Sequence, residues 1–237
     1  MAEYKLPADV VEKYKTSYHA HLVLDKGDLS APTCVTCHGN HGARPPGVAE
    51  VEQVCGKCHV RQRELYEKSP HAEVAAAGGF PGCIGCHGNH AIQKASVSLF
   101  AQACVKCHST DPKQLAVRDE IAGLLQRANA DYNAAAAKVR EATLRGLATD
   151  DEQLLLQEAH TQLTQLEALQ HTLTPATLKP VTERAESAVQ ETLKGVTLLE
   201  HVENWKRGAL VPVWVFLVVM AVLFAAKRRQ IEKRKEK

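Results

Sequence analysis

Several signals of common enzyme classes are missing from this sequence. No Ser/His/Asp constellation, phosphate-binding loop or pair of carboxylates stands out, so the sequence offers no basis for hydrolysis or phosphoryl transfer. Methionine is scarce, because Met1 and Met220 are the only two in 237 residues. Cysteine is absent after residue 107, and no cysteine lies outside one short repeated motif. The chemistry of the chain must therefore come from that motif and from its histidines.

The repeated motif is Cys-x-x-Cys-His, and its four copies use all eight cysteines. This pentapeptide is typical of covalent c-type haem attachment, in which two thiols bond to the porphyrin and the histidine binds the iron. Structural zinc would not need a histidine after every second cysteine, and disulfides would not impose this spacing repeatedly. The sequence predicts four haems, attached at Cys34 and Cys37, Cys55 and Cys58, Cys83 and Cys86, and Cys104 and Cys107. The expected proximal iron ligands are His38, His59, His87 and His108.

The motif region is a duplication of a two-motif unit, covering about 14–59 and 66–108. Each unit has two further recurrent histidines, the number needed to place a second histidine on each iron. These predicted distal ligands are His19 and His41 in the first unit, and His71 and His90 in the second. The two methionines lie at the terminus and in a long apolar run, so neither can serve there. Because methionine ligation raises haem potential, histidine at both axial positions predicts low-potential, low-spin haems.

The partner of each distal histidine follows less directly from the sequence. His41 lies only three residues after His38, too close to reach the opposite face of the same porphyrin. We therefore expect His41 to bind a neighbouring haem, and His90 to do likewise. That arrangement would bring the haems into close contact.

Two other histidines are alternative distal ligands. His21 is the nearest rival of His19, although its counterpart in the second unit is Glu73. His171 lies far along the chain and could reach back to replace one of the four. An iron with no distal ligand would instead have an open face and would make the protein an enzyme.

An uncharged apolar run of 18 residues occupies 209–226, near the lower limit for a membrane-spanning helix. Seven basic and two acidic residues follow in 227–237, and Trp205 and Trp214 lie near the other end of the run. Basic segments favour the cytoplasmic side, and tryptophan is enriched at membrane interfaces. We expect a single C-terminal span in a bacterial cytoplasmic membrane, with the tail in the cytoplasm and the motif region on the periplasmic side.

Export agrees with the motifs, because c-type haem is attached outside the bacterial cytoplasmic membrane. No secretory signal is recognisable at residues 1–7, so we expect that the native signal was removed or that the native start differs. Without the tail, 22 of the 29 basic and 25 of the 27 acidic residues remain, a net charge of −3. An acidic exported part argues against nucleic acid as a partner.

The expected fold class is mostly α. Residues 1–111 are rich in glycine and proline, which predicts little regular structure around a core of haems. Residues 112–206 have apolar stripes at three-and-four spacing, interrupted near Gly146 and at Pro175 and Pro180. This pattern predicts an antiparallel bundle or hairpin whose third helix covers about 181–206. The span at 207–227 and a tail at 228–237 complete the expected domains, and the helical domain could support an oligomer.

The motif region resembles a known family. Ser-x-His-Ala, then Ala-Pro-Thr-Cys-x-x-Cys-His-Gly-x-His, then a second Cys-x-x-Cys-His are similar to class III, cytochrome c3-type multihaem proteins of anaerobic bacteria. The same pattern is also similar to the haem-pair modules of octahaem reductases and of hydroxylamine-oxidoreductase-like enzymes. The resemblance covers about 14–108 and implies closely packed bis-histidine haems, electron transfer, and distal roles for the four recurrent histidines. Membrane-anchored tetrahaem quinol dehydrogenases are also similar, but their anchor is N-terminal.

Together, the motifs, the apolar run and the resemblance predict a membrane-anchored tetrahaem cytochrome rather than an enzyme. Electrons would pass between a membrane respiratory donor, with quinol as one source, and a periplasmic or complex-bound redox partner. The expected partners are redox proteins, including other subunits of a membrane respiratory complex. The alternatives are a quinol dehydrogenase subunit and a small-molecule reductase with one open-site haem.

Overall fold

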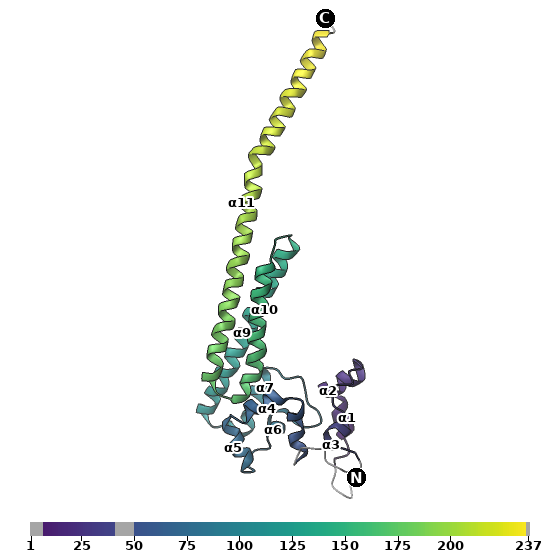
Figure 1. Ribbon diagram of the computed structural model, residues 1–237, viewed down its shortest axis with the longest axis vertical. Coiled ribbons are helices and arrows are strands. Elements are labelled where there is room, and N and C mark those ends of the chain that lie inside the picture. Colours follow the sequence, from purple (N-terminus) through teal and green to yellow (C-terminus); the bar gives the residue numbers. More distant parts are fainter. Residues whose placement is uncertain (1–6, 41–49, 236–237) are drawn as a thin grey trace. The chain divides into compact units, whose positions relative to one another are not determined.

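The computed structural model describes residues 7–40 and 50–235. Within these ranges the chain is mostly helical and has no β-strand, which confirms the expected mostly α class (Figure 1). The short elements are α1 (Val10–Lys15), α2 (Tyr18–Ala20), the π-helical turn η2 (His21–Asp25), α3 (Cys34–His38), the 3-10 segment η3 (Val51–Lys57), α4 (Val60–Tyr66), α5 (Pro70–Ala76), α6 (Cys83–His87), α7 (Ser98–Ala103) and α8 (Val105–His108). The long helices are α9 (Pro112–Leu144), α10 (Asp150–Leu169) and α11 (Pro175–Lys235), and the 3-10 turn η4 (Gln170–Thr172) separates the last two.

Two of the Cys-x-x-Cys-His motifs are short helices in their own right. They are α3 and α6, and each ends at the glycine that follows the motif histidine. Gly39 has φ 75° and ψ −178°, and Gly88 has φ 71° and ψ −166°. Only glycine adopts this region readily, so the residue after the histidine sets the end of both helices. The other two motifs lie across the ends of short elements, at η3 and α4 and at α7 and α8.

The long helices α9 and α10 bury most of the apolar stripes predicted for them. The buried stripe residues are Ile121, Leu124, Ala128, Ala135, Val139 and Ala142 on α9, and Ala159, Leu163 and Leu166 on α10. The chain leaves α9 through Gly146, whose φ is 81°. The predicted start of the third helix near residue 181 was wrong, because α11 already begins at Pro175. Pro180 removes only one backbone hydrogen bond near the helix start, while its neighbour Val181 stays buried.

Contacts divide the chain into two compact units. Unit 1 comprises 1–131 and 159–186, and unit 2 comprises 132–158 and 187–237. Each unit contains a segment of all three long helices, and unit 1 contains the four motifs. The domain bounds expected from the sequence, at about residues 111 and 206, stay predictions.

Unit 1 has a tightly packed helical part beside the motif region. Ile121, Leu166 and Leu178 are fully buried side chains, one from each long helix. The Nζ atom of Lys179 on α11 lies 2.7 Å from a carboxylate oxygen of Glu120 on α9. The turn η4 packs against α4 of the motif region. A rigid helical surface therefore adjoins the motifs within this unit.

Unit 2 contains the rest of the long helices and the apolar run. Val139, Ala142 and Val196 form a buried cluster in its helical part. Farther along, α11 includes an 18-residue window with a mean hydropathy of 2.7, none of which is buried. One helix is therefore long and apolar enough to cross a membrane, which confirms that part of the localisation prediction.

Candidate functional site: four facing histidine pairs

Every motif histidine lies opposite a second histidine from another part of unit 1. The ring centroids of the four pairs are 5.9 to 6.3 Å apart, and the ring planes differ by 15° to 33°. The pairs are His19 with His59, His38 with His90, His71 with His108, and His87 with His171. An imidazole nitrogen binds first-row metals at about 2 Å, and the ring centroid lies half a ring behind that nitrogen. Two imidazoles on opposite sides of one metal ion therefore have ring centroids about 6 Å apart. Each pair thus has the spacing of two ligands on opposite sides of one metal ion.

Two of these pairs occupy equivalent places in the two repeat units of the sequence, which cover about 14–59 and 66–108 and are called the first and second unit below. His19 of the first unit faces the histidine of its own second motif, His59. His71 of the second unit likewise faces the histidine of its own second motif, His108. The same local sequence therefore gives the same pairing twice.

Two equivalent tyrosines support this correspondence. Tyr14 and Tyr66 align in the repeat, and each lies beside the first motif of its own unit. Burial, then the thiols of Cys34 and Cys37, raise the pKa of the Tyr14 hydroxyl. Burial, and after it the thiols of Cys83 and Cys86, raise the pKa of the Tyr66 hydroxyl. The hydroxyl of Tyr14 donates a hydrogen bond to the carbonyl oxygen of Pro32, 2.8 Å away, which fixes the approach to α3.

The third pair joins the two repeat units. His38 closes α3 in the first unit, whereas His90 follows α6 in the second. Their rings are 5.9 Å apart and 15° from parallel. The sequence predicted that His90 binds a neighbouring haem; the structure places its ring opposite that of His38, and the ligation itself stays a prediction. The corresponding histidine of the first unit, His41, lies outside the described residues.

The fourth pair brings in a residue from the helical part of the chain. His171 lies in η4, just after α10, and its ring faces that of His87 at 6.3 Å and 21°. Its Nδ1 atom is 3.0 Å from the carbonyl oxygen of Ala168. Sequence reasoning named His171 only as an alternative, because nothing in the local pattern shows that the turn packs against α4.

Partial burial favours the neutral form of several of these imidazoles. Desolvation is the main cause that lowers the pKa of His19, His71, His87 and His171. The facing ring adds to the effect at His87, where the second cause is His171. A neutral imidazole has a lone pair on one ring nitrogen, which is the form that binds a metal. The local electrostatics therefore suit metal ligation.

The cysteines of successive motifs lie close to one another. The helices α3 and α6 both pack against η3, and α6 also packs against α7. A hydrogen bond between the thiols of Cys55 and Cys83 raises the pKa of Cys55 and lowers that of Cys83 to about 6. Burial raises the pKa of Cys86, and the nearby Cys104 raises it further. All eight cysteines fall in the described ranges and none forms a disulfide there.

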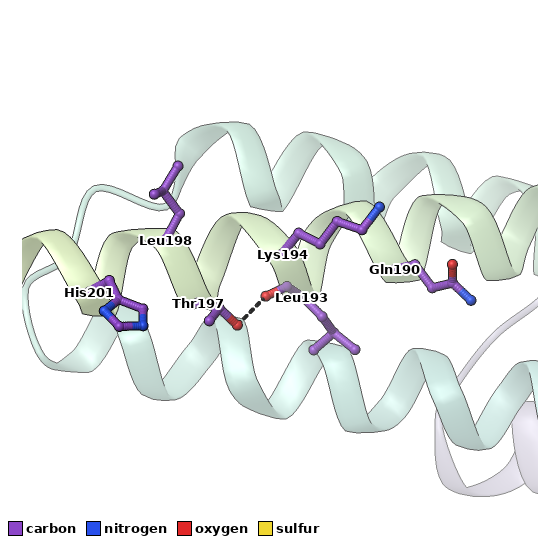
Figure 2. A pocket seen from close by; sticks show the side chains of 6 residues that line it. All are labelled: Gln190, Leu193, Lys194, Thr197, Leu198 and His201. Carbon is purple, nitrogen blue, oxygen red and sulfur yellow. Dashed lines mark hydrogen bonds between the residues drawn. The ribbon is translucent and has the colours of Figure 1, made fainter.

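Other histidines occupy different surroundings. Nδ1 of the exposed His21 lies 2.6 Å from a carboxylate oxygen of Asp25, and no motif histidine faces its ring in the described part of the chain. His201 lines a shallow pocket on one face of α11, formed by Gln190, Leu193, Lys194, Thr197, Leu198 and His201 (Figure 2). In residues 7–40 and 50–235, no group of three or more His, Cys, Asp or Glu side chains could hold a metal ion. The candidate site therefore consists of the four imidazole pairs and their adjoining cysteines.

Comparison with known proteins identifies no relative. No protein-family model matches this chain, and no curated protein or solved structure matches it.

Proposed function

We propose that this protein is a membrane-anchored tetrahaem c-type cytochrome that transfers electrons. The observation that carries the proposal is the facing of each motif histidine by a second imidazole at 5.9 to 6.3 Å. The motif assigns one haem to each cysteine pair. The facing ring would supply a second iron ligand, so the covalent and the coordinative parts of each proposed site rest on separate observations.

The residues present fit a haem better than a metal held by protein alone. A porphyrin supplies the four equatorial nitrogens, so two protein ligands on opposite sides complete six-coordinate iron. Each pair offers two such ligands and no more. The thiols of the same motif hold the porphyrin edge, and the short motif helices set the direction of the proximal imidazole.

Once bound, haem supplies an iron that accepts and releases one electron. In each pair the second imidazole would take the position opposite the motif histidine, which would leave no open position on the iron for a substrate. Ligands held in place by the chain would change little in geometry between oxidation states, and the half-buried ring of His171 is held in this way by its contact with the carbonyl oxygen of Ala168. Successive motifs pack against one another through α3, η3, α6 and α7, which supports a short path for electrons.

The apolar part of α11 supports a location of this activity at a membrane surface. Basic residues follow the apolar part of α11, which favours a cytoplasmic C-terminus and a periplasmic haem region. The donor would be a membrane respiratory protein or quinol-linked enzyme, and the acceptor a periplasmic or complex-bound redox protein. A reductase would instead need one iron with an open face.

The test is the haem content and spin state of the detergent-purified, full-length protein. It should be produced in a bacterium that attaches c-type haem, with motif variants in which both cysteines are serine as controls. We expect four haems per chain, low-spin EPR signals throughout, no carbon monoxide binding, and one haem fewer in each control. A chain without covalent haem would refute the cytochrome. A high-spin haem that binds small ligands would favour the reductase.

A further inference from the structure

The fourth histidine pair breaks the symmetry of the duplication. In each repeat unit the histidine of the Ser-x-His sequence, His19 or His71, faces the histidine of that unit's second motif. His90 of the second repeat unit faces His38, which belongs to the first motif of the first repeat unit. A symmetric exchange would therefore place His41 opposite His87. The structure has His171 opposite His87 instead, 6.3 Å away.

We infer that His171 is the distal ligand of the haem attached at Cys83 and Cys86. This inference rests on the proposed function, since it assigns one ligand of the proposed haems. It makes the turn between α10 and α11 part of a haem site. The helical segment would thus be more than a spacer between the motifs and the membrane anchor.

The ring of His171 is oriented for this role. Its Nδ1 atom lies 3.0 Å from the carbonyl oxygen of Ala168, so the N–H group belongs on Nδ1. The lone pair is then on Nε2, the nitrogen that a distal ligand offers to iron. Metal-bound histidines commonly donate their other N–H to a carbonyl in this way, which fixes the ring and increases its basicity.

The turn that carries His171 is held firmly. The next residue, Thr172, is buried, and its hydroxyl donates a hydrogen bond to the carbonyl oxygen of Leu169 at 2.9 Å. That hydroxyl is also 2.7 Å from the hydroxyl of Thr177 on α11. The packing of η4 against α4 adds contacts to the motif region. His171 is therefore preorganised opposite His87.

The experiment compares alanine variants of three histidines in the full-length holoprotein. H171A is the test, H41A represents the symmetric alternative, and H160A removes an exposed histidine from the same helical segment. The readouts are haem per chain, the high-spin EPR signal and carbon monoxide binding by the reduced protein. We expect H171A to keep four haems while one of them becomes high-spin and binds carbon monoxide. Added imidazole should restore the low-spin state, and H41A and H160A should stay fully low-spin.

The outcomes separate this inference from the proposed function. A fully low-spin H171A protein overturns the inference, most directly if H41A gains a high-spin haem, while four haems in the wild type leave the function intact. Loss of covalent haem from the wild type would overturn both. If H171A does not accumulate, H171M decides, because a thioether ligand should raise the potential of one haem. An H171M protein with four unchanged potentials would refute the assignment.

Discussion

His38 and His90 come from different repeat units, yet their imidazole rings lie 5.9 Å apart and 15° from parallel. The first motif of the chain therefore depends on a histidine that follows the third motif. The first repeat unit therefore takes one facing histidine from the second, whereas the third motif, in the second repeat unit, is faced by His171 from outside both. A duplicated sequence has here produced one connected group of sites.

Replacement of His90 by alanine should open one iron in the proposed first haem. The ring of His90 is the one that faces His38, so its removal should leave that position empty. We expect one of the four haems to become high-spin in the EPR spectrum and to bind carbon monoxide. H21A is the matched control, because His21 is exposed and bonded to Asp25. Equal spectra for H90A and the wild type would contradict the pairing.

A larger residue at Gly85 should disturb the site of His71. A Cβ atom at Gly85 would lie 2.6 Å from Cζ of Phe80, and the Phe80 ring stacks on that of His71 at 4.8 Å. The first unit has Thr36 at the equivalent position. We expect G85A to lower the free energy of unfolding by about 1–3 kcal/mol through overpacking.

Denaturant unfolding of the holoprotein measures that loss. The double variant F80L/G85A should recover part of it, because the shorter leucine leaves room for the new methyl group. A G85A effect of the same size with and without Phe80 would show that the contact is not responsible.

Gly88 should be intolerant of a side chain for a backbone reason alone. No atom lies within 4 Å of the place where its Cβ would be, but its φ is 71°. We expect G88A to reduce stability by about 1–3 kcal/mol, seen as a lower thermal midpoint. Gly208 is the control, because it lies within α11 with nothing within 4 Å of its Cβ position. G208A should be neutral or slightly stabilising, so equal losses in the two variants would refute the explanation.

The orientation of the anchor can be tested in cells. A fluorescent protein that folds only in the cytoplasm, fused after Lys237, should be bright because the basic tail favours the cytoplasmic side. Alkaline phosphatase at the same position should be inactive, since it needs the periplasm. Active phosphatase with a dark fluorescent fusion would reverse the proposed topology.

The sequence by itself determined the features that depend on neighbouring residues. The cysteine spacing of each motif, the glycine that ends α3 and α6, the apolar stripes of α9 and α10, and the apolar part of α11 all follow from local pattern. It also predicted His19, His41, His71 and His90 as distal ligands, because the repeat shows which histidines recur. The rings of His19, His71 and His90 lie opposite motif histidines, and their ligation stays a prediction. Local rules were less reliable at Pro180, where tertiary packing carries α11 through a residue that often ends a helix.

Only the tertiary structure decided which imidazole faces which. His87 and His171 meet because η4 packs against α4, and no spacing in the chain reports a contact between such distant segments. The pairing depends on the burial of apolar side chains in unit 1, where Leu166 and Leu178 hold the turn in place. Hydrophobic packing follows no sequence period or motif that identifies which segments will meet. His171 could therefore be named from the sequence only as an alternative distal ligand.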